Sequence, residues 1–304
     1  MRDIPATGHY VWGMMKSTHT STYHHISAKD HQRILDHYHL ALPLMAFHFS
    51  GTPLVYAAYP RGLGSYTVFD AVLHRPPPRG EPTIDVQTAK GWRTYLVLER
   101  QTMEHAIEHG SAVEFFGWGC QESAPSVPRF GRILLEPDRE FRGSVAQAAI
   151  PMRDVLHREG LDAIPLLDGR RGLALWVPIG LSTTYPELRR SMHAICKKTV
   201  EQHSDRFSVQ PNTTVEGKVH LHVDSNAPGR FSCLPYSLRG GEELFVCTPV
   251  RWEELPQVHD GDFTAETFPK RLASSGDIFD GYLRTFGGGD DDAVRVKPAG
   301  VRAP

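Results

Sequence analysis

Residues 218–255 contain the pattern that most restricts what this chain can form. Val219, Leu221 and Val223 alternate with polar residues, which is the period-2 pattern of a β-strand with one apolar face. The pattern therefore predicts a strand over 218–224 whose other face carries two imidazoles, an ammonium group and a carboxylate. These polar residues are Lys218, His220, His222 and Asp224.

This polar face has two interpretations. Antiparallel sheets commonly leave one face to solvent, so the four side chains fit a plain solvated surface. His-x-His-x-Asp also suits metal binding, because alternate residues of a strand point to the same side and because imidazole and carboxylate groups are metal ligands. The spacing alone leaves both interpretations open.

Composition limits the class of protein. With 304 residues, of which 40% are hydrophobic and 22% charged, the chain is long enough for one large domain or two lobes. The net charge of -2 gives no global basic surface, so a nucleic-acid contact needs a local groove. The four cysteines form no Cys-x-x-Cys pair, no apolar run reaches about 20 residues, and the amino terminus lacks a signal-peptide pattern. We expect a cytoplasmic protein with reduced thiols and no membrane contact.

Hydrophobic periodicity and turn residues predict mixed helices and strands. The clearest helix spans Thr184–His203, where Thr184 and Glu187 form a capping box and apolar residues form a stripe. A strand is predicted over Gly131–Pro137. The predicted organisation is a flexible arm over 1–24, one domain over 25–285 and a disordered tail over 286–304.

A series of motifs extends along most of the chain. Asn226, the Tyr236–Arg239 turn and the run Thr248–Leu255 follow the predicted strand, and upstream motifs occur at His37-Tyr38, Gly51–Leu54, Ala58–Gly62 and Ser111–Phe116. In order and spacing they resemble the polymerase domain of bacterial DNA ligase D, a branch of the archaeo-eukaryotic primase superfamily. The resemblance covers about residues 28–257.

The resemblance implies both a fold and an activity. The implied fold is α/β (α+β): a two-lobed, primase-polymerase-like body of mixed, largely antiparallel sheets flanked by helices. It implies that the strands Gly131–Pro137 and Lys218–Asp224 are neighbours, because the family's metal site draws on both. The implied activity is nucleotidyl transfer to DNA or RNA ends with two metal ions held by three aspartates.

The chain departs from the family at these catalytic positions. Aligning Pro137 with the family's Asp-x-Asp-Pro places Leu134 and Glu136 at two of the aspartates, and aligning Asn226 places His222 at the third. One carboxylate remains where three are expected, which predicts a catalytically degenerate protein. Other positions of the family's pocket hold Phe116, Ala71, Ala58 and Ala174, with Asp168 at a serine.

The resemblance also implies a residual phosphate site. Arg171 lies in the glycine-framed turn Asp168–Gly172, Arg239 lies in the Tyr-Ser-x-Arg turn, and Lys218 and His220 lie on the polar face. Guanidinium groups bind phosphate through paired hydrogen bonds, whereas the carboxylate of Asp168 repels it. We therefore expect weak binding, with solvated surface arginines as the alternative.

Three hypotheses about function remain open. The leading one is a catalytically degenerate protein that binds a nucleotide, nucleic acid or a protein partner. The second is an active nucleotidyltransferase with magnesium or manganese, in which a two-residue register shift brings together Glu136, Asp138 and Asp224 with His222 as a further ligand. Pro137 and Asn226 oppose that shift, and Asp138 also fits a turn. The third is a non-polymerase metal site on Glu136, His220 or His222, and Asp224, where imidazole favours zinc.

Overall fold

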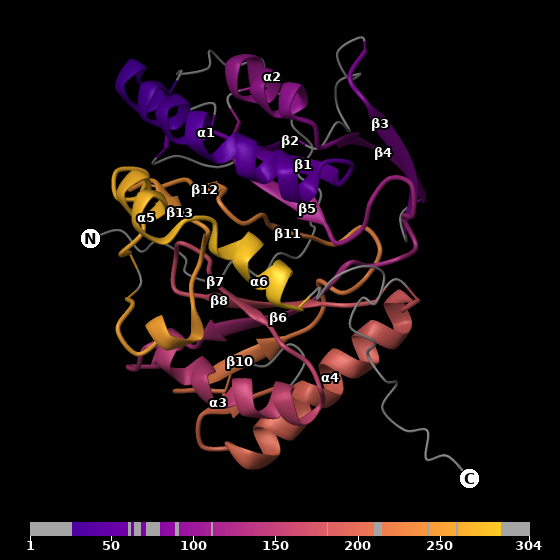
Figure 1. Ribbon diagram of the computed structural model, residues 1–304, viewed down its shortest axis with the longest axis vertical. Helices are drawn as coiled ribbons and strands as arrows, with labels where there is room; N and C mark the ends of the chain where they lie inside the picture. Colours follow the sequence, from indigo (N-terminus) through magenta and orange to yellow (C-terminus); the bar gives the residue numbers. More distant parts are fainter. Residues whose placement is uncertain are drawn as a thin grey trace.

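The computed structural model describes residues 26–59, 62–63, 68–70, 80–88, 91–110, 112–180, 182–209, 215–241, 243–259 and 261–286. The predicted arm over 1–24 lies outside the described residues, as does the predicted tail except for Phe286. The described residues form two lobes, each with its own six-stranded sheet (Figure 1).

The first lobe is built from the N-terminal half of the chain and one strand, β11, from the C-terminal half. Its sheet has the order β11-β5-β1-β4-β3, with β2 paired to β1. Two helices, α1 (Ala28–Phe49) and α2 (Arg100–Gly110), bury apolar side chains in the same core as this sheet. The strands are β1 (Pro53–Ala58), β2 (Val68–Asp70), β3 (Thr83–Thr88), β4 (Gly91–Val97), β5 (Ala112–Trp118) and β11 (Phe231–Cys233).

The second lobe has a sheet with the order β14-β7-β8-β6-β10-β9. Helices α3 (Val145–Arg158) and α4 (Tyr185–Gln202) pack on it, and the predicted capping box of Thr184 and Glu187 begins α4. In the described residues only β9 and β10 pair in parallel. The strands are β6 (Phe130–Pro137), β7 (Ile164–Leu167), β8 (Leu173–Pro178), β9 (Phe207–Ser208), β10 (Val219–His222) and β14 (Thr248–Pro249).

The second sheet presents two different faces. Ile133 and Leu135 of β6 join Val219 and Leu221 of β10 in the core beneath α3 and α4. Trp176 of β8 instead joins the core of the first lobe. Successive residues of a strand point to opposite faces of its sheet. The residues that alternate with these apolar positions therefore point toward the first lobe. On β6 and β10 they are Arg132, Leu134, Glu136, His220 and His222.

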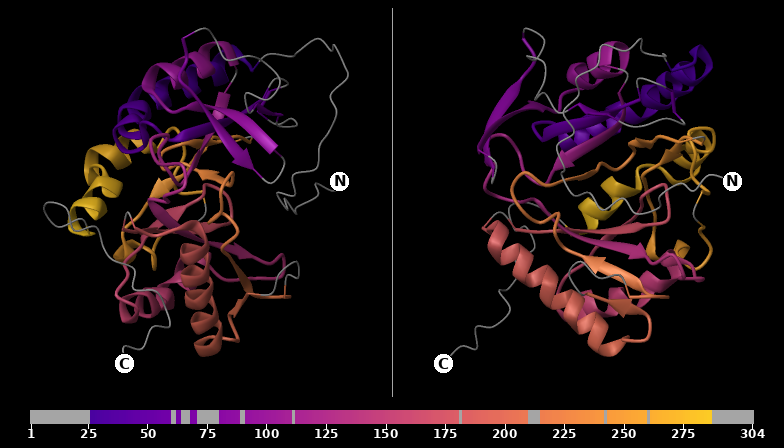
Figure 2. Two further views of the ribbon diagram at one scale, coloured as in Figure 1. Left: turned by 90° about the vertical axis from the view of Figure 1, so that its right-hand side faces the viewer. Right: turned by 180° about the vertical axis from the view of Figure 1, so that it is seen from behind.

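The C-terminal part of the chain connects the two lobes. The strands β12 (Leu238–Arg239) and β13 (Phe245–Val246) form a small separate sheet. The short 3₁₀ helix Trp252–Glu254 packs into the core of the second lobe, whereas α5 (Phe268–Ser275) and α6 (Ile278–Phe286) pack against that of the first. Figure 2 shows α5 and α6 along the side of the molecule where the lobes meet. Among the described residues, no helix is long and apolar enough to cross a membrane.

This architecture confirms the predicted fold class of mixed, largely antiparallel sheets flanked by helices. The predicted contact between the two site strands is also confirmed, because β10 pairs antiparallel with β6 from Val219 opposite Pro137 to His222 opposite Leu134. The four polar residues of 218–224 do not share one open surface, however. His220 is buried, and Lys218 and Asp224 lie outside the strand.

Candidate functional site

Strand pairing brings three positions of interest side by side across β10, β6 and β8. His222 lies opposite Leu134, and Leu134 lies opposite Ala174 on the next strand. Leu134 is half-buried and packs against the core of the first lobe, and Ala174 is buried there. The centre of this face therefore has no carboxylate, although the sequence alignment expects metal-binding aspartates here.

Glu136 and His222 are the pair that the structure does bring together. The His222 Nε2 atom lies 3.0 Å from Glu136 Oε2, and both side chains are partly open to solvent. The ring of His222 also meets that of His220 edge to face, with 4.1 Å between centroids. A carboxylate beside an imidazole accepts its N–H group and so fixes the orientation of the ring.

The other predicted metal ligands have different partners. Asp138 accepts hydrogen bonds from the backbone N–H groups of Gly217 and Glu140, and these bonds lower the pKa of its carboxyl. Asp138 is therefore a turn residue, as its sequence context allowed. Asp224 lies beyond the end of β10 and forms an exposed ion pair with Arg189 at 2.5 Å.

His220 does not serve as an open ligand either. It is 4% exposed, and its Nδ1 atom lies 3.0 Å from the hydroxyl of Ser208 on β9. Glu136, Asp138, His222 and Asp224 thus do not assemble into the rebuilt carboxylate centre of the second hypothesis. Throughout the described ranges, no group of three or more His, Cys, Asp or Glu side chains is arranged to hold a metal ion.

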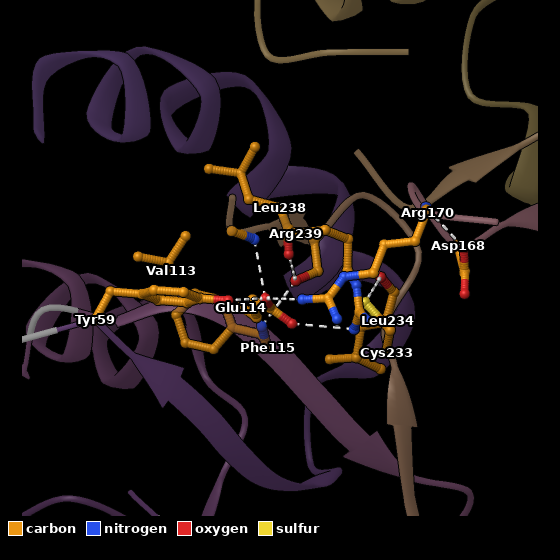
Figure 3. A network of polar contacts seen from close by, with 12 residues as sticks. Tyr59, Val113, Glu114, Phe115, Asp168, Arg170, Cys233, Leu234, Leu238 and Arg239 are labelled. Carbon is orange, nitrogen blue, oxygen red and sulfur yellow. Dashed lines mark hydrogen bonds and ion pairs between the residues drawn. The ribbon is translucent and has the colours of Figure 1, made fainter. Parts of the chain in front are cut away.

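A buried carboxylate that the sequence analysis did not select lies at the centre of another polar cluster (Figure 3). Glu114 of β5 is 1% exposed. Its Oε1 atom accepts hydrogen bonds from the hydroxyl of Tyr59, from the backbone of Gly240 at 2.9 Å and from Arg170 at 3.3 Å. Its Oε2 atom lies 3.0 Å from Nη1 of Arg239. We call these five residues the Glu114 cluster.

Glycine is required where the backbone closes on this cluster. A Cβ atom at Gly240 would lie 2.3 Å from the ring of Tyr59, a distance that no side chain permits. Gly169 has a φ of +74°, and a Cβ atom there would lie 2.9 Å from Cβ of Phe245 and 3.0 Å from Cγ of Arg239. Gly169 therefore lets the turn of Arg170 pack directly on Arg239, and Gly240 lets the loop after Arg239 lie against Tyr59.

The predicted phosphate-binding residues are in different environments. Arg239 is 5% exposed, pairs with Glu114, and lies over the ring of Phe116 at 5.5 Å. Arg171 is exposed on its turn and makes a long hydrogen bond of 3.4 Å to the carbonyl of Phe141. Lys218 donates to the carbonyl of Ser204 at 2.6 Å. Phosphate binding by Arg171, Arg239, Lys218 and His220 stays a prediction, and these residues do not form one cluster.

The carboxylate of Asp168 forms hydrogen bonds within its own turn. Its Oδ1 atom accepts hydrogen bonds from the backbone of Arg170 at 2.8 Å and Gly172 at 3.1 Å. An aspartate in this arrangement closes a turn through its own side chain. Arg170 and Arg171 are both exposed on this turn, and the guanidinium of Arg170 reaches back to Glu114.

Asn226, one of the matched motif positions, has a structural role. It is 1% exposed, accepts a hydrogen bond from the backbone N–H of Arg132 at 2.7 Å, and donates to the carbonyl of Arg132 at 2.6 Å. The amide thus completes the pairing of β6 just beyond the end of β10. Ala58 is buried, whereas Ala71 lies outside the described residues.

Comparison with known families decides the relationship. The profile described as "LigD, primase-polymerase domain" matches residues 31–279. The chain belongs to the LigD primase-polymerase family. This membership fits the register of β6 and β10, the Asn226 amide bridge and the turn that carries Arg239.

Named LigD proteins show how far the likeness extends. The multifunctional non-homologous end joining DNA repair protein LigD of Mycobacterium tuberculosis is 24% identical over 261 residues, with 81% of this chain and 34% of the relative covered. The bifunctional non-homologous end joining protein LigD of Bacillus subtilis is 27% identical over 154 residues, with 50% and 25% covered. The chain therefore spans about a third, or less, of the length of these LigD relatives.

A solved LigD structure has the same fold. The polymerase domain of Mycobacterium tuberculosis ligase D, determined in complex with DNA, aligns with a TM-score of 0.76 at 19% identity. The alignment covers 89% of this chain and 98% of that domain. At this identity the likeness establishes the fold of the LigD polymerase domain and leaves the chemistry to be argued from the residues.

Proposed function

We propose that this chain is a catalytically degenerate LigD primase-polymerase domain that binds phosphate groups of nucleotides or nucleic-acid ends without transferring them. The observation that carries the proposal is the register of β10, β6 and β8, which aligns His222, Leu134 and Ala174. Two-metal nucleotidyl transfer needs clustered carboxylates to hold the cations, and an alkyl side chain in the middle of the set supplies none.

The charge of the Glu114 cluster supports weak anion binding. Two guanidinium groups, of Arg170 and Arg239, share the carboxylate of Glu114. The 168–172 turn adds the guanidinium of Arg171 and the carboxylate of Asp168, so this part of the site keeps one net positive charge. Arg239 is buried in its ion pair, but the Arg170 side chain is 47% exposed and Arg171 beside it is exposed. An exposed guanidinium pair on one turn can receive a phosphate through bidentate hydrogen bonds.

The relatives support the choice of ligand class. The Mycobacterium tuberculosis polymerase domain, which shares the fold, was solved in complex with DNA. The exposed contacts of Arg170 and Arg171 limit the binding energy, since surface charge contacts are screened by salt. The proposal therefore specifies weak, salt-sensitive binding to the phosphates of DNA or a nucleotide.

A titration tests this proposal. Binding of a nucleoside triphosphate and of a short 5′-phosphorylated DNA is measured for the wild type and for an Arg170→Ala/Arg171→Ala double variant. We expect weaker binding by the variant and a smaller dependence on salt concentration, because two phosphate contacts are lost. Arg239 is left intact because truncating a buried charge would also disturb the fold.

The matched control removes two arginines elsewhere. Arg158 on α3 and Arg190 on α4 are exposed, and an Arg158→Ala/Arg190→Ala variant changes the net charge equally. We expect this control to bind like the wild type. Equal binding by all three proteins, or equal weakening in both variants, would contradict a phosphate site on the 168–172 turn.

A further inference from the structure

Two cysteines meet where the chain turns before Arg239. The carbonyl of Leu234 accepts a hydrogen bond from Ser237 N at 3.1 Å, and Tyr236 has a φ of 71°, the only positive value among described non-glycine residues. This tight turn begins directly after Cys233. Cys247 pairs with the turn through its backbone, accepting from Tyr236 N at 2.7 Å and donating to Ser237 O at 2.8 Å. The fold therefore places Cys233 and Cys247 on either side of one turn.

The two thiols interact with each other and with a cation. The Cys233 thiol donates to the carbonyl of Leu234 at 3.8 Å, at the start of the turn. Cys247 and the guanidinium of Arg239 both act on the pKa of Cys233, so the two thiols and the cation belong to one cluster. Figure 3 shows the Cys233 sulfur next to Arg239, within the set of residues around Glu114. All four cysteines of the chain are free thiols. A thiol pair beside a guanidinium differs from an ordinary buried cysteine, because the cation stabilises a thiolate.

The pair is chemically asymmetric. Cys233 is partly exposed, whereas Cys247 is 1% exposed. Burial acts to raise the pKa of Cys233, but the Cys247 hydrogen bond and the charge of Arg239 outweigh burial, so its pKa lies below the ordinary value. Burial raises the pKa of Cys247 well above the ordinary value. One thiol is thus suited to attack an oxidant, and the other to remain protonated beside it.

The remaining cysteines provide an internal contrast. Cys120 and Cys196 are fully buried, and burial raises their pKa values to about 11 and about 12. A buried neutral thiol is a poor nucleophile, because the thiolate is the reactive form. Of the four thiols in the chain, Cys233 is therefore the one expected to react first.

We propose that Cys233 and Cys247 form a redox-active dithiol that a peroxide converts into an intramolecular disulfide. The Cys233 thiolate attacks one peroxide oxygen, the O–O bond breaks, and Cys233 becomes a sulfenic acid as hydroxide leaves. The Cys247 sulfur then attacks the Cys233 sulfur, the S–O bond breaks, and water leaves as the Cys247 proton is lost. Overall, two thiols lose two electrons, the peroxide gains them, and two waters form.

The disulfide would change the site that the turn supports. It would link the two ends of the 233–247 segment, which contains Arg239, and it would remove the Cys233 thiolate from that guanidinium. The crosslink itself depends only on the thiol pair and not on any ligand of the protein. Its formation can therefore be tested without assuming the proposed function.

The test treats the full chain with hydrogen peroxide and counts thiols after denaturation. We expect the wild type to lose two of its four thiols, to remain monomeric in mass, and to recover all four with dithiothreitol. Peptide mass mapping is expected to find Cys233 joined to Cys247. Retention of all four thiols at peroxide levels that oxidise a low-pKa model thiol would overturn the proposal.

Variants separate the two roles. In Cys247→Ser, the oxidised Cys233 has no partner, so we expect a sulfenic acid that dimedone traps and no internal crosslink. A Cys196→Ser control, which removes a buried thiol of another lobe, should form the same disulfide at the wild-type rate. A crosslink that uses Cys120 or Cys196, one that joins two chains, or unchanged crosslinking in Cys247→Ser would exclude the assigned pair.

Discussion

Glu114 shows how this protein keeps a carboxylate in its interior. A buried ionised group is costly unless hydrogen bonds and opposite charges replace the lost water. Here the hydroxyl of Tyr59, the N–H of Gly240 and two guanidinium groups supply those contacts. The residue connects β5, the 168–172 turn and the Arg239 loop, so its chemistry helps to position both arginine-bearing segments.

Removing this charge tests the role of the cluster. Glu114→Gln leaves the buried guanidinium of Arg239 without its counter-ion, and breaking a buried ion pair in this way typically costs about 3–5 kcal/mol. We expect that loss in the free energy of unfolding measured with urea. The exposed Glu122 provides the control, since Glu122→Gln should change stability by less than about 0.5 kcal/mol. A similar, small loss of unfolding free energy in both variants would mean that the Glu114 cluster does not stabilise the fold.

At the scale of elements, α6 is tied to the turn that precedes Arg239. Asp277, just before α6, interacts with Nε2 of His48 at 2.7 Å and accepts a hydrogen bond from the hydroxyl of Tyr236. Tyr236 also has the strained positive φ of this turn, and its carbonyl lies 2.9 Å from Nε2 of His37. The surrounding contacts therefore hold an uncommon backbone conformation in place.

The pH dependence of stability tests this connection. Burial acts to raise the pKa of Asp277, but the hydrogen bonds from His48 and Tyr236 outweigh burial and lower the pKa from its ordinary value. Ionised Asp277 then stabilises the folded chain above the unfolded pKa, and this contribution is lost as pH falls through the folded value. We expect the Tm of the wild type to fall more between pH 6 and about pH 3 than that of Asp277→Asn. Parallel Tm curves would show that the contact contributes no ionisation-linked stability.

Strong local patterns were enough to predict several elements. The strand predicted over Gly131–Pro137 forms β6 (Phe130–Pro137), and Thr184 caps α4 as its sequence indicated. The short strands β11 to β14 were not predicted, since two or three residues carry no periodicity and form through distant pairing.

The site was predictable in position but not in its contacts. The family resemblance correctly predicted that β6 and β10 are neighbours, and this pairing brings Glu136 and His222 together. His220 is in hydrogen-bond contact with Ser208, and Asp224 forms an ion pair with Arg189. Neither partner is adjacent in sequence, so these contacts could not be predicted from the local pattern. Glu114 was overlooked because its partners come from three separate segments, around Tyr59, Arg170 and Arg239, although it lay inside a matched motif.

The whole molecule combines the LigD polymerase fold with central residues that differ from those that the family resemblance implies. The two sheets, the amide bridge of Asn226 and the paired β6 and β10 retain the framework. The positions expected to hold metal-binding aspartates instead present Leu134, Glu136 and His222. Replacing several ligands of a two-metal centre removes the charge that stabilises the transferring phosphoryl group, and such losses reduce rates by orders of magnitude.

Primer extension tests this account most directly. Wild type and Glu136→Gln are each given a primed template and nucleotides with magnesium or manganese, alongside the Mycobacterium tuberculosis polymerase domain as a positive control. We expect no measurable extension by either protein, while circular dichroism shows both folded. Extension by the wild type that disappears in Glu136→Gln would contradict the degenerate assignment and establish a working metal centre on β6.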